Sequence, residues 1–117
     1  MGSLILTEQK EWGALVTLNR PKALNALNTD VLRELDDVLA RLNARKETQV
    51  VILTGSGEKA FAAGADIAAM REMTPGEARQ FSAYGQAVMT RIAGMRAMVI
   101  AAVNGFALGG GCELAMA

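Results

Sequence analysis

The segment 99–117 constrains the fold of this chain more than any other part of the sequence. It begins with an apolar run, 99–103, whose length and β-branched residues are typical of a buried strand. Asn104-Gly105 then interrupts the strand, and Gly109-Gly110-Gly111 leads directly into residues 112–116, which suit a helix. The sequence therefore predicts a strand, a glycine-lined turn and the first turns of a helix.

This predicted turn could bind a substrate and take part in its reaction. The free N–H groups at a helix start, together with the positive end of the helix dipole, point into it, and glycines let a ligand approach the backbone closely. Glu113 lies just inside the helix. Backbone donors beside one carboxylate are what a carbonyl substrate needs when its oxygen must become negative while a proton moves. Glu113 could equally be a first-turn acid that complements the dipole, and the residues alone leave both interpretations open.

Composition narrows the possible functions. The chain has 117 residues, of which 51% are apolar, so it forms one domain at most and can bury a core. Twelve acidic and twelve basic residues balance without a basic block, which argues against nucleic acid as the main partner. The chain has no histidine and one cysteine, so it cannot build a Ser-His or Cys-His dyad, a histidine metal site or an internal disulfide.

Both ends of the chain carry information about its cellular context. Segment 1–8 has an apolar run too short, and an acid too early, for a signal peptide. No apolar stretch reaches membrane-spanning length, so we expect a soluble, cytoplasmic protein without a membrane partner. The predicted last helix stops at Ala117 without a capping residue, and we therefore expect the chain to be a fragment of a longer protein.

The preceding residues predict strands that alternate with helices. Asn28 is a good N-cap, and Thr74 and Glu77 form a capping box in front of Pro75. The predicted elements are a hairpin of strands 4–7 and 14–18, a connecting loop 22–27, a helix from Asn28 to about 45, a strand 49–54, a loop 60–67, a short helix 67–72 and a helix from 74 to about 94. This alternation indicates an α/β fold with parallel β/α units.

Two further segments could carry a function. Gly55, Gly57 and Ala60 fit a dinucleotide-binding pattern, but no long helix or acidic strand end follows, so we interpret this segment as a plain turn. Segment 60–67 contains four alanines and a glycine, which suit either a backbone that lies close to a ligand or a tight loop under a helix. Asp66 is expected to be the N-cap of the next helix, and Cys112 a small packed residue.

Three blocks of sequence resemble a known family. Segments 19–27 (NRPKALNAL), 59–67 (KAFAAGADI) and 101–116 (AAVNGFALGGGCELAM) are similar to the enoyl-CoA hydratase/isomerase, or crotonase, family, and most of all to its short-chain enoyl-CoA hydratases. The resemblance covers essentially the whole chain in the right order. It implies an α/β, crotonase-like ββα spiral, of which 1–117 would be the N-terminal part, and assembly into trimers or pairs of trimers. It also implies hydration of 2-enoyl-CoA thioesters in fatty acid metabolism (β-oxidation).

The resemblance assigns roles to individual residues. By it, the N–H groups of Ala65 and Gly110 form an oxyanion hole for the thioester oxygen, and Glu113 is the first of two catalytic glutamates. It implies no metal and no cofactor, since coenzyme A is part of the substrate. The residues that it places along the CoA and acyl path are Lys22, Ala23, Leu24, Ala63, Ala65, Asp66, Ile67, Ala68 and Gly110.

The chain also departs from the family pattern. Ala68 replaces a lysine that is common in the family, which weakens an expected contact with a CoA phosphate, and Met98 stands where many members have proline. The second catalytic glutamate would lie beyond Ala117. Two alternatives therefore stay open: an enoyl-CoA double-bond isomerase or other acyl-CoA enzyme of the family, and a non-catalytic CoA-binding or oligomerisation module if the short chain is the natural product. The activity of the isolated chain is left open as well.

Overall fold

The computed structural model describes residues 4–117. Residues 1–3, part of the segment used above to exclude a signal peptide, lie outside the described residues. The elements in chain order are β1 (Ile5–Lys10), β2 (Gly13–Leu18), the 3-10 turn η1 (Pro21–Ala23), α1 (Thr29–Ala44), β3 (Val50–Gly55), β4 (Ala60–Ala62), α2 (Ile67–Arg71), α3 (Pro75–Ala93), β5 (Met98–Ala102), β6 (Phe106–Ala107) and α4 (Gly110–Met116).

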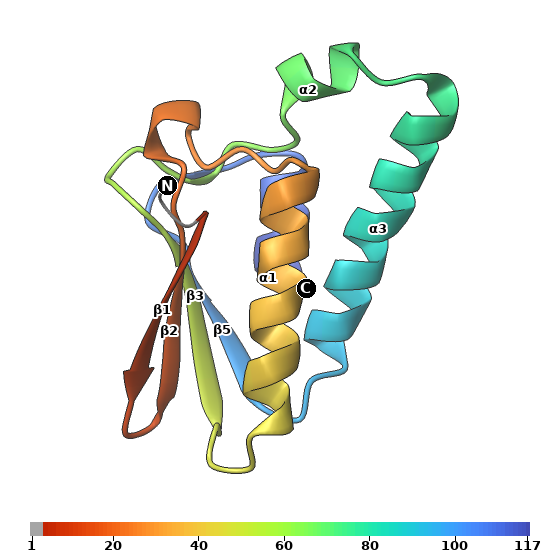
Figure 1. The fold of residues 1–117 in the computed structure, drawn as a ribbon. Coiled ribbons are helices and arrows are strands. Elements are labelled where there is room, and N and C mark those ends of the chain that lie inside the picture. The colour runs from red at the N-terminus through yellow and green to blue at the C-terminus, as the bar shows by residue number, and fades with distance from the viewer. Residues whose placement is uncertain (1–3) are drawn as a thin grey trace.

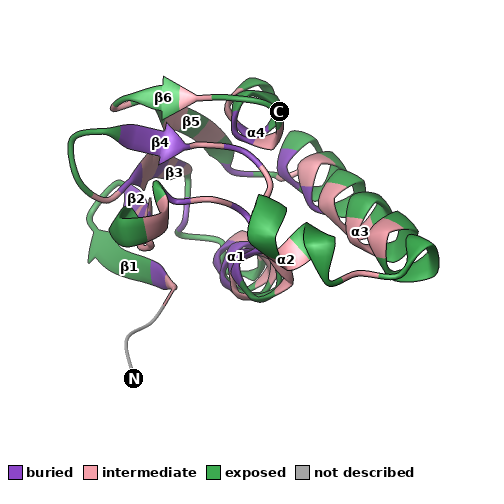
Figure 2. Cartoon of the chain, turned by 90° about the horizontal axis from the view of Figure 1, so that it is seen from above, coloured by how far each residue is buried: buried purple, intermediate pink, exposed green. Residues whose placement is uncertain are grey.

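The main sheet has four strands in the order β1-β2-β3-β5. β1 and β2 form the predicted antiparallel hairpin, and both strands extend further than expected, to a two-residue turn at Glu11 and Trp12. β3 pairs parallel with β2 on one side and with β5 on the other, as the alternating pattern predicted. α1 and α3 lie on the same side of this sheet, so the core forms between the sheet and the two helices (Figures 1 and 2).

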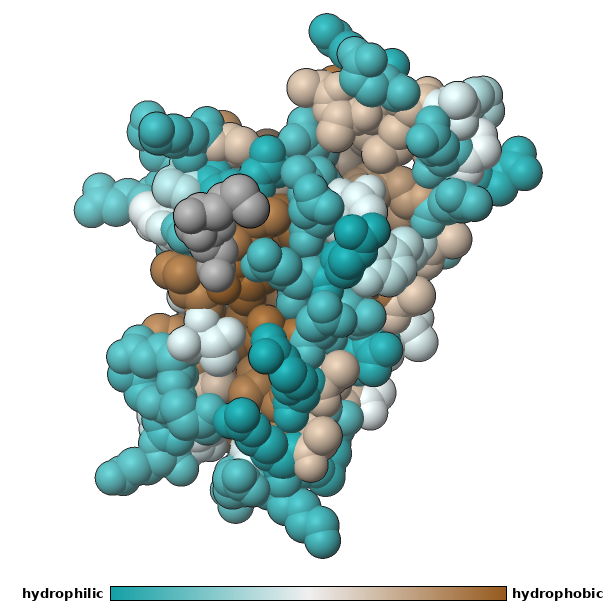
Figure 3. Space-filling model, in the orientation of Figure 1, coloured by the Kyte–Doolittle hydropathy of each residue, from teal (hydrophilic) through white to brown (hydrophobic). Residues whose placement is uncertain are grey.

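α1 is built as its sequence predicted. The side chain of Asn28 accepts a hydrogen bond of 2.8 Å from the Val31 N–H and caps the helix. The apolar residues that recur at helical spacing are all buried: Val31, Leu32, Leu35, Val38, Leu39 and Leu42. Apolar side chains fill the space between β1 and α1, bordered by hydrophilic ones (Figure 3). The Glu34 carboxylate of α1 also accepts the N–H groups of Leu4 and Ile5 at 3.0 and 2.9 Å, which ties β1 to the helix.

α3 begins with the predicted capping box. The Thr74 hydroxyl accepts the Glu77 N–H at 3.1 Å, and the Glu77 carboxylate accepts the Thr74 N–H at 2.9 Å. Val88 and Ile92 are buried, and Phe81, Tyr84 and Met95 are partly buried and pack against the core. Within residues 4–117, no helix combines the length and the apolar content that a membrane crossing requires.

A second, two-stranded parallel sheet joins β4 to β6, and the sequence did not predict it. The loop expected over 60–67 is wrong in its first three residues, which form β4. Alanines give little strand signal, and the partner strand lies far along the chain. The predicted loop 22–27 likewise overlaps the end of η1. Cys112 is exposed rather than packed because α4 turns that side outward.

The close contact between α4 and β4 depends on Gly111. A Cβ added there would lie only 1.9 Å from the Ala62 carbonyl oxygen, so no side chain fits. We predict that Gly111→Ala in the intact gene product lowers the free energy of unfolding by about 1–3 kcal/mol, because α4 must move off β4.

Gly76→Ala is the matched control, since a Cβ there meets nothing nearer than the Thr74 hydroxyl at 4.0 Å. It should leave stability unchanged or raise it by up to about 1 kcal/mol, as alanine is the better helix former. Denaturant titration of both variants measures the difference. Equal stability of the two variants would contradict the importance of this contact.

Candidate active site

The small β4–β6 sheet brings two turns together. Because the strands are parallel, the residues that follow β4 and those that follow β6 leave the sheet at the same end. A Cβ on Gly110 would lie 3.8 Å from the Ala65 nitrogen, and one on Gly64 would lie 4.0 Å from the Gly110 nitrogen. Gly64 has a φ of 111° and approaches the Leu108 carbonyl closely, which few other residues could do. The N–H groups of Ala65 and Gly110 are therefore close neighbours.

The direction of the Ala65 N–H follows from its peptide partner. The Leu27 N–H donates to the Gly64 carbonyl at 2.7 Å, and the Asp66 N–H donates to the Leu27 carbonyl at 2.8 Å. The Gly64–Ala65 peptide is planar and trans, so its N–H points opposite to its carbonyl. The hydrogen bond from Leu27 therefore turns the Ala65 N–H away from Leu27.

The Gly110 N–H is oriented in the same way. Gly110 is the first residue of α4, so its N–H has no acceptor within the helix. The Glu113 N–H donates to the Gly109 carbonyl at 3.0 Å and so holds that carbonyl against the helix. The Gly109–Gly110 peptide then points its N–H outward from the helix start.

Ala65, Gly110 and Glu113 line one pocket, of about 270 Å³. Most of the remaining lining is apolar, and its polar members, Ser82 and Gln86, come from α3. The other residues that line it are Leu27, Leu32, Met70, Ala78, Phe81, Gly85 and Met89. The sequence predicted a helix here but not its contribution to this pocket, because helical periodicity does not distinguish a core face from a pocket wall.

Glu113 lies at the rim of the pocket. The residue is exposed, and it also borders a neighbouring hollow between α3 and α4 of about 560 Å³. Among residues 4–117, no basic side chain lies within 4.0 Å of its carboxylate. The carboxylate is thus accessible from the pocket and from solvent alike.

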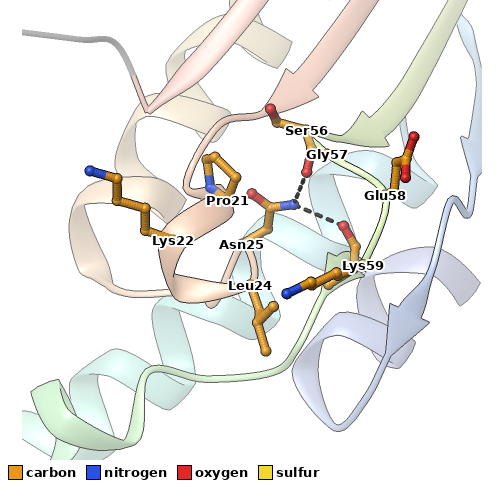
Figure 4. Close-up of a pocket in the computed structure, with 9 residues that line it drawn as sticks. Pro21, Lys22, Leu24, Asn25, Ser56, Gly57, Glu58 and Lys59 are labelled. Atoms are coloured by element: carbon orange, nitrogen blue, oxygen red, sulfur yellow. Dashed lines mark hydrogen bonds between the residues drawn. The ribbon is translucent and has the colours of Figure 1, made fainter.

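The residues expected along the CoA path are divided between several surfaces. Lys22 and Leu24 line a separate pocket of about 410 Å³ (Figure 4), and Ala23 lines a further hollow next to it. Ala63 adjoins Leu24, whose carbonyl accepts the Ala63 N–H at 3.0 Å. Ile67, 69% exposed, and Ala68 lie on the outer side of α2. The structure therefore gathers Ala65, Gly110 and Glu113 in one pocket. The predicted residues that do not line it are Lys22, Ala23, Leu24, Ala63, Asp66, Ile67 and Ala68.

Asn25 supports this region, and its role was not predicted from the sequence. The residue is 1% exposed and has a φ of 56°. Its side-chain oxygen accepts the Arg20 N–H at 2.8 Å, and its nitrogen donates to the carbonyls of Ser56 and Ala60 at 3.0 and 2.9 Å (Figure 4). One amide thus fastens the turn after β2 to the segment between β3 and β4. Within a predicted loop, an asparagine between alanine and leucine carries no distinguishing signal.

Asp66 is the N-cap of α2, as predicted. One carboxylate oxygen accepts the Ala69 N–H at 3.1 Å, and the other pairs with the Arg20 guanidinium at 3.1 Å. The hydrogen bond from the Ala69 N–H and the neighbouring Arg20 side chain hold the pKa of this carboxyl below its usual value.

Elsewhere in the described chain, as here, no group of three acidic, cysteine or histidine side chains is arranged to hold a metal ion.

Comparison with known proteins identifies the family of this chain. The sequence model of the enoyl-CoA hydratase/isomerase family matches residues 8–117. The chain belongs to this family. It is 54% identical over 112 residues to a short-chain-enoyl-CoA hydratase of Clostridium acetobutylicum, with 96% of this chain covered, and 54% identical over 112 residues to a crotonyl-CoA hydratase of Syntrophomonas wolfei.

Solved structures confirm the crotonase-like fold. The chain superposes on the crystal structure of an enoyl-CoA hydratase from Bacillus anthracis with a TM-score of 0.94 at 37% sequence identity, over 97% of this chain and 45% of that one. The Clostridium and Syntrophomonas relatives are each covered over 43% of their length. This enoyl-CoA hydratase/isomerase chain therefore spans less than half the length of the relatives that it matches.

The carboxyl of Asp66 should make the stability of this family member depend on pH. Because its pKa is lowered in the folded state, its contribution is present above the unfolded value of 3.8 and is lost as pH falls through the folded value. We predict that Asp66→Asn lowers the melting temperature at neutral pH, and that the difference from the wild-type protein shrinks below about pH 4.

Asparagine is as good an N-cap as aspartate, so α2 should persist in this variant. Thermal unfolding from pH 7 down to pH 2.5 measures the effect. A difference in melting temperature that stays constant over this range would show that ionised Asp66 contributes nothing specific.

Proposed function

We propose that the intact protein is a hydratase that adds water across the double bond of 2-enoyl-CoA thioesters. The observation that carries this proposal is that Ala65, Gly110 and Glu113 line the same pocket. The names of the two relatives at 54% identity support the same activity.

The chemistry follows from what these groups can do. The thioester oxygen would accept both N–H groups, and negative charge would build on it as water adds to the β-carbon. Fixed backbone donors already aimed at that oxygen lower the barrier by about 3 kcal/mol each. Glu113 would exchange a proton with the water, and a second glutamate beyond Ala117 would supply the other acid/base group.

The remaining roles rest on the family resemblance. The acyl group would enter the apolar 270 Å³ pocket, and coenzyme A, as part of the substrate rather than a cofactor, would run along 22–24 and 63–68. Ala68 offers no charge there. We further propose that 1–117 is the N-terminal part of the domain, and that the intact protein is a cytoplasmic trimer or pair of trimers active in fatty acid metabolism.

Double-bond isomerisation is the second candidate, because the same pocket of backbone donors and Glu113 would serve it. Glu113 is the only carboxylate among the residues that line the 270 Å³ pocket in the described chain. Moving a proton between two carbons of a bound enolate needs one such group, whereas hydration in this family uses two. A single carboxylate is therefore sufficient for the isomerase alternative.

Replacing the Glu113 carboxylate tests the proposed chemistry. We predict that Glu113→Gln in the intact gene product lowers kcat on crotonyl-CoA by about 100-fold or more, because the amide cannot exchange a proton with water. The loss of the absorbance of the conjugated thioester measures turnover. Glu47→Gln, an exposed carboxylate between α1 and β3, is the matched control and should leave kcat unchanged.

The same assay separates the alternatives. Loss of crotonyl-CoA absorbance with the wild-type protein supports the hydratase. An isomerase would instead generate that absorbance from a 3-enoyl-CoA and leave crotonyl-CoA unconsumed. Binding of crotonyl-CoA without either reaction would indicate a non-catalytic CoA-binding module and contradict both enzymatic proposals.

A further inference from the structure

Two short segments determine the direction of the Ala65 N–H. Residues 24–27 run parallel to 63–66, joined by three backbone hydrogen bonds: Ala63 N–H to Leu24, Leu27 N–H to Gly64 and Asp66 N–H to Leu27. The middle bond fixes the Gly64 carbonyl and, through the planar peptide, the direction of the Ala65 N–H. Any slip of one segment against the other would therefore change that direction.

Segment 24–27 does not hold this shape by local preference. Leu24 and Asn25 both adopt left-handed backbone conformations, with φ of 54° and 56°. Such conformations cost energy for residues other than glycine and persist only where surrounding contacts maintain them. Asn25 supplies contacts on the β3 side through Ser56 and Ala60. On the side that faces residues 63–66, side-chain contacts add to the three backbone hydrogen bonds.

Arg20 supplies those contacts. One guanidinium nitrogen donates to the Ala26 carbonyl at 2.7 Å, and another donates to the Asp66 carboxylate at 3.1 Å. Ala26 directly precedes Leu27, and Asp66 directly follows Ala65, so one side chain links the two segments beside the middle hydrogen bond. The Arg20 and Asp66 side chains are only 21% and 18% exposed, so water screens this pair weakly.

We propose that Arg20 is a positioning residue that holds the Ala65 N–H in its productive direction. This inference rests on the proposed function. Arg20 does not line the 270 Å³ pocket, so it acts on the thioester oxygen only through the backbone of 63–66. A planar guanidinium suits the task because it presents donors to two acceptors at once, which a lysine ammonium does less well.

Kinetics of two Arg20 variants in the intact gene product test the proposal. For Arg20→Gln we expect kcat on crotonyl-CoA to fall about 10-fold with KM nearly unchanged, a part of the roughly 100- to 1,000-fold loss that follows removal of one oxyanion donor. Arg20→Lys should give an intermediate kcat, since one charged donor reaches only one of the two acceptors well. Arg20 also borders the hollow that contains Lys22 and Ala23, so a raised KM with unchanged kcat would assign it to CoA binding and overturn the proposal.

An infrared measurement distinguishes a changed direction of the Ala65 N–H from a loss of protein stability. Butyryl-CoA has no double bond to hydrate, and hydrogen bonds to its thioester oxygen lower the stretching frequency of its carbonyl. Infrared difference spectra of ¹³C-carbonyl-labelled butyryl-CoA on the wild-type protein should show a lowered frequency. On Arg20→Gln the frequency should move back toward the value in water. An unchanged frequency together with unchanged kcat would overturn the proposal.

Two further variants complete the design. Arg91→Gln breaks the ion pair of Arg91 with Asp36, which joins α3 to α1 away from the pocket, and should leave kcat and the carbonyl frequency unchanged whatever it does to stability. Asp66→Asn retains the N-cap of α2 but loses the charged partner of Arg20, and should reproduce the kinetic effect if Arg20→Gln does not fold. If the wild-type protein does not lower the carbonyl stretching frequency of butyryl-CoA, the proposed function is contradicted, and this inference with it. A shift that all variants share overturns the positioning role alone.

Discussion

The hydrogen bond from the Leu27 N–H to the Gly64 carbonyl is the contact on which the candidate site depends. It joins the turn after β2 to the turn after β4, and the rigid peptide that it holds carries the Ala65 N–H on its other edge. The bond from the Glu113 N–H to the Gly109 carbonyl orients the second donor in the same way. The direction of each donor N–H is thus set by the hydrogen bond that the carbonyl of its own peptide accepts. No side chain at the ligand surface is needed for this.

Close packing of backbone on backbone brings these two peptides together. Gly111 lies where a Cβ would overlap the Ala62 carbonyl, and a Cβ on Gly105 would lie 2.3 Å from the Lys59 carbonyl. The glycines and alanines of these turns therefore leave room for β4, β6 and α4 to meet, at the cost of the apolar burial that larger residues would provide. Apart from Phe61 of β4 and Leu114 of α4, which are buried, the large side chains of the core lie mainly in β2, β3 and α1, where Val16, Leu53 and Leu35 are buried.

The acid and the donors differ in how firmly they are held. Ala65 and Gly110 belong to peptides fixed by hydrogen bonds, whereas Glu113 is exposed on a seven-residue helix at the pocket rim. The expected CoA contacts are spread over η1, the 63–66 segment and α2. The described residues thus form a rigid donor pair with an accessible carboxylate, and the family relationship gives this arrangement its proposed chemistry.

The sequence by itself determined the local structure and the family. Helical spacing and capping residues located α1 and α3, β-branched runs located β3 and β5, and the glycine turn before Glu113 located the start of α4. These signals succeed because capping and apolar periodicity act between residues close in the chain. Only the tertiary structure decided that β4 pairs with β6, that Asn25 is buried, that Arg20 reaches Asp66, and that α3 lines the pocket. Each of these depends on contacts between distant segments, whose partners no local pattern of residues specifies.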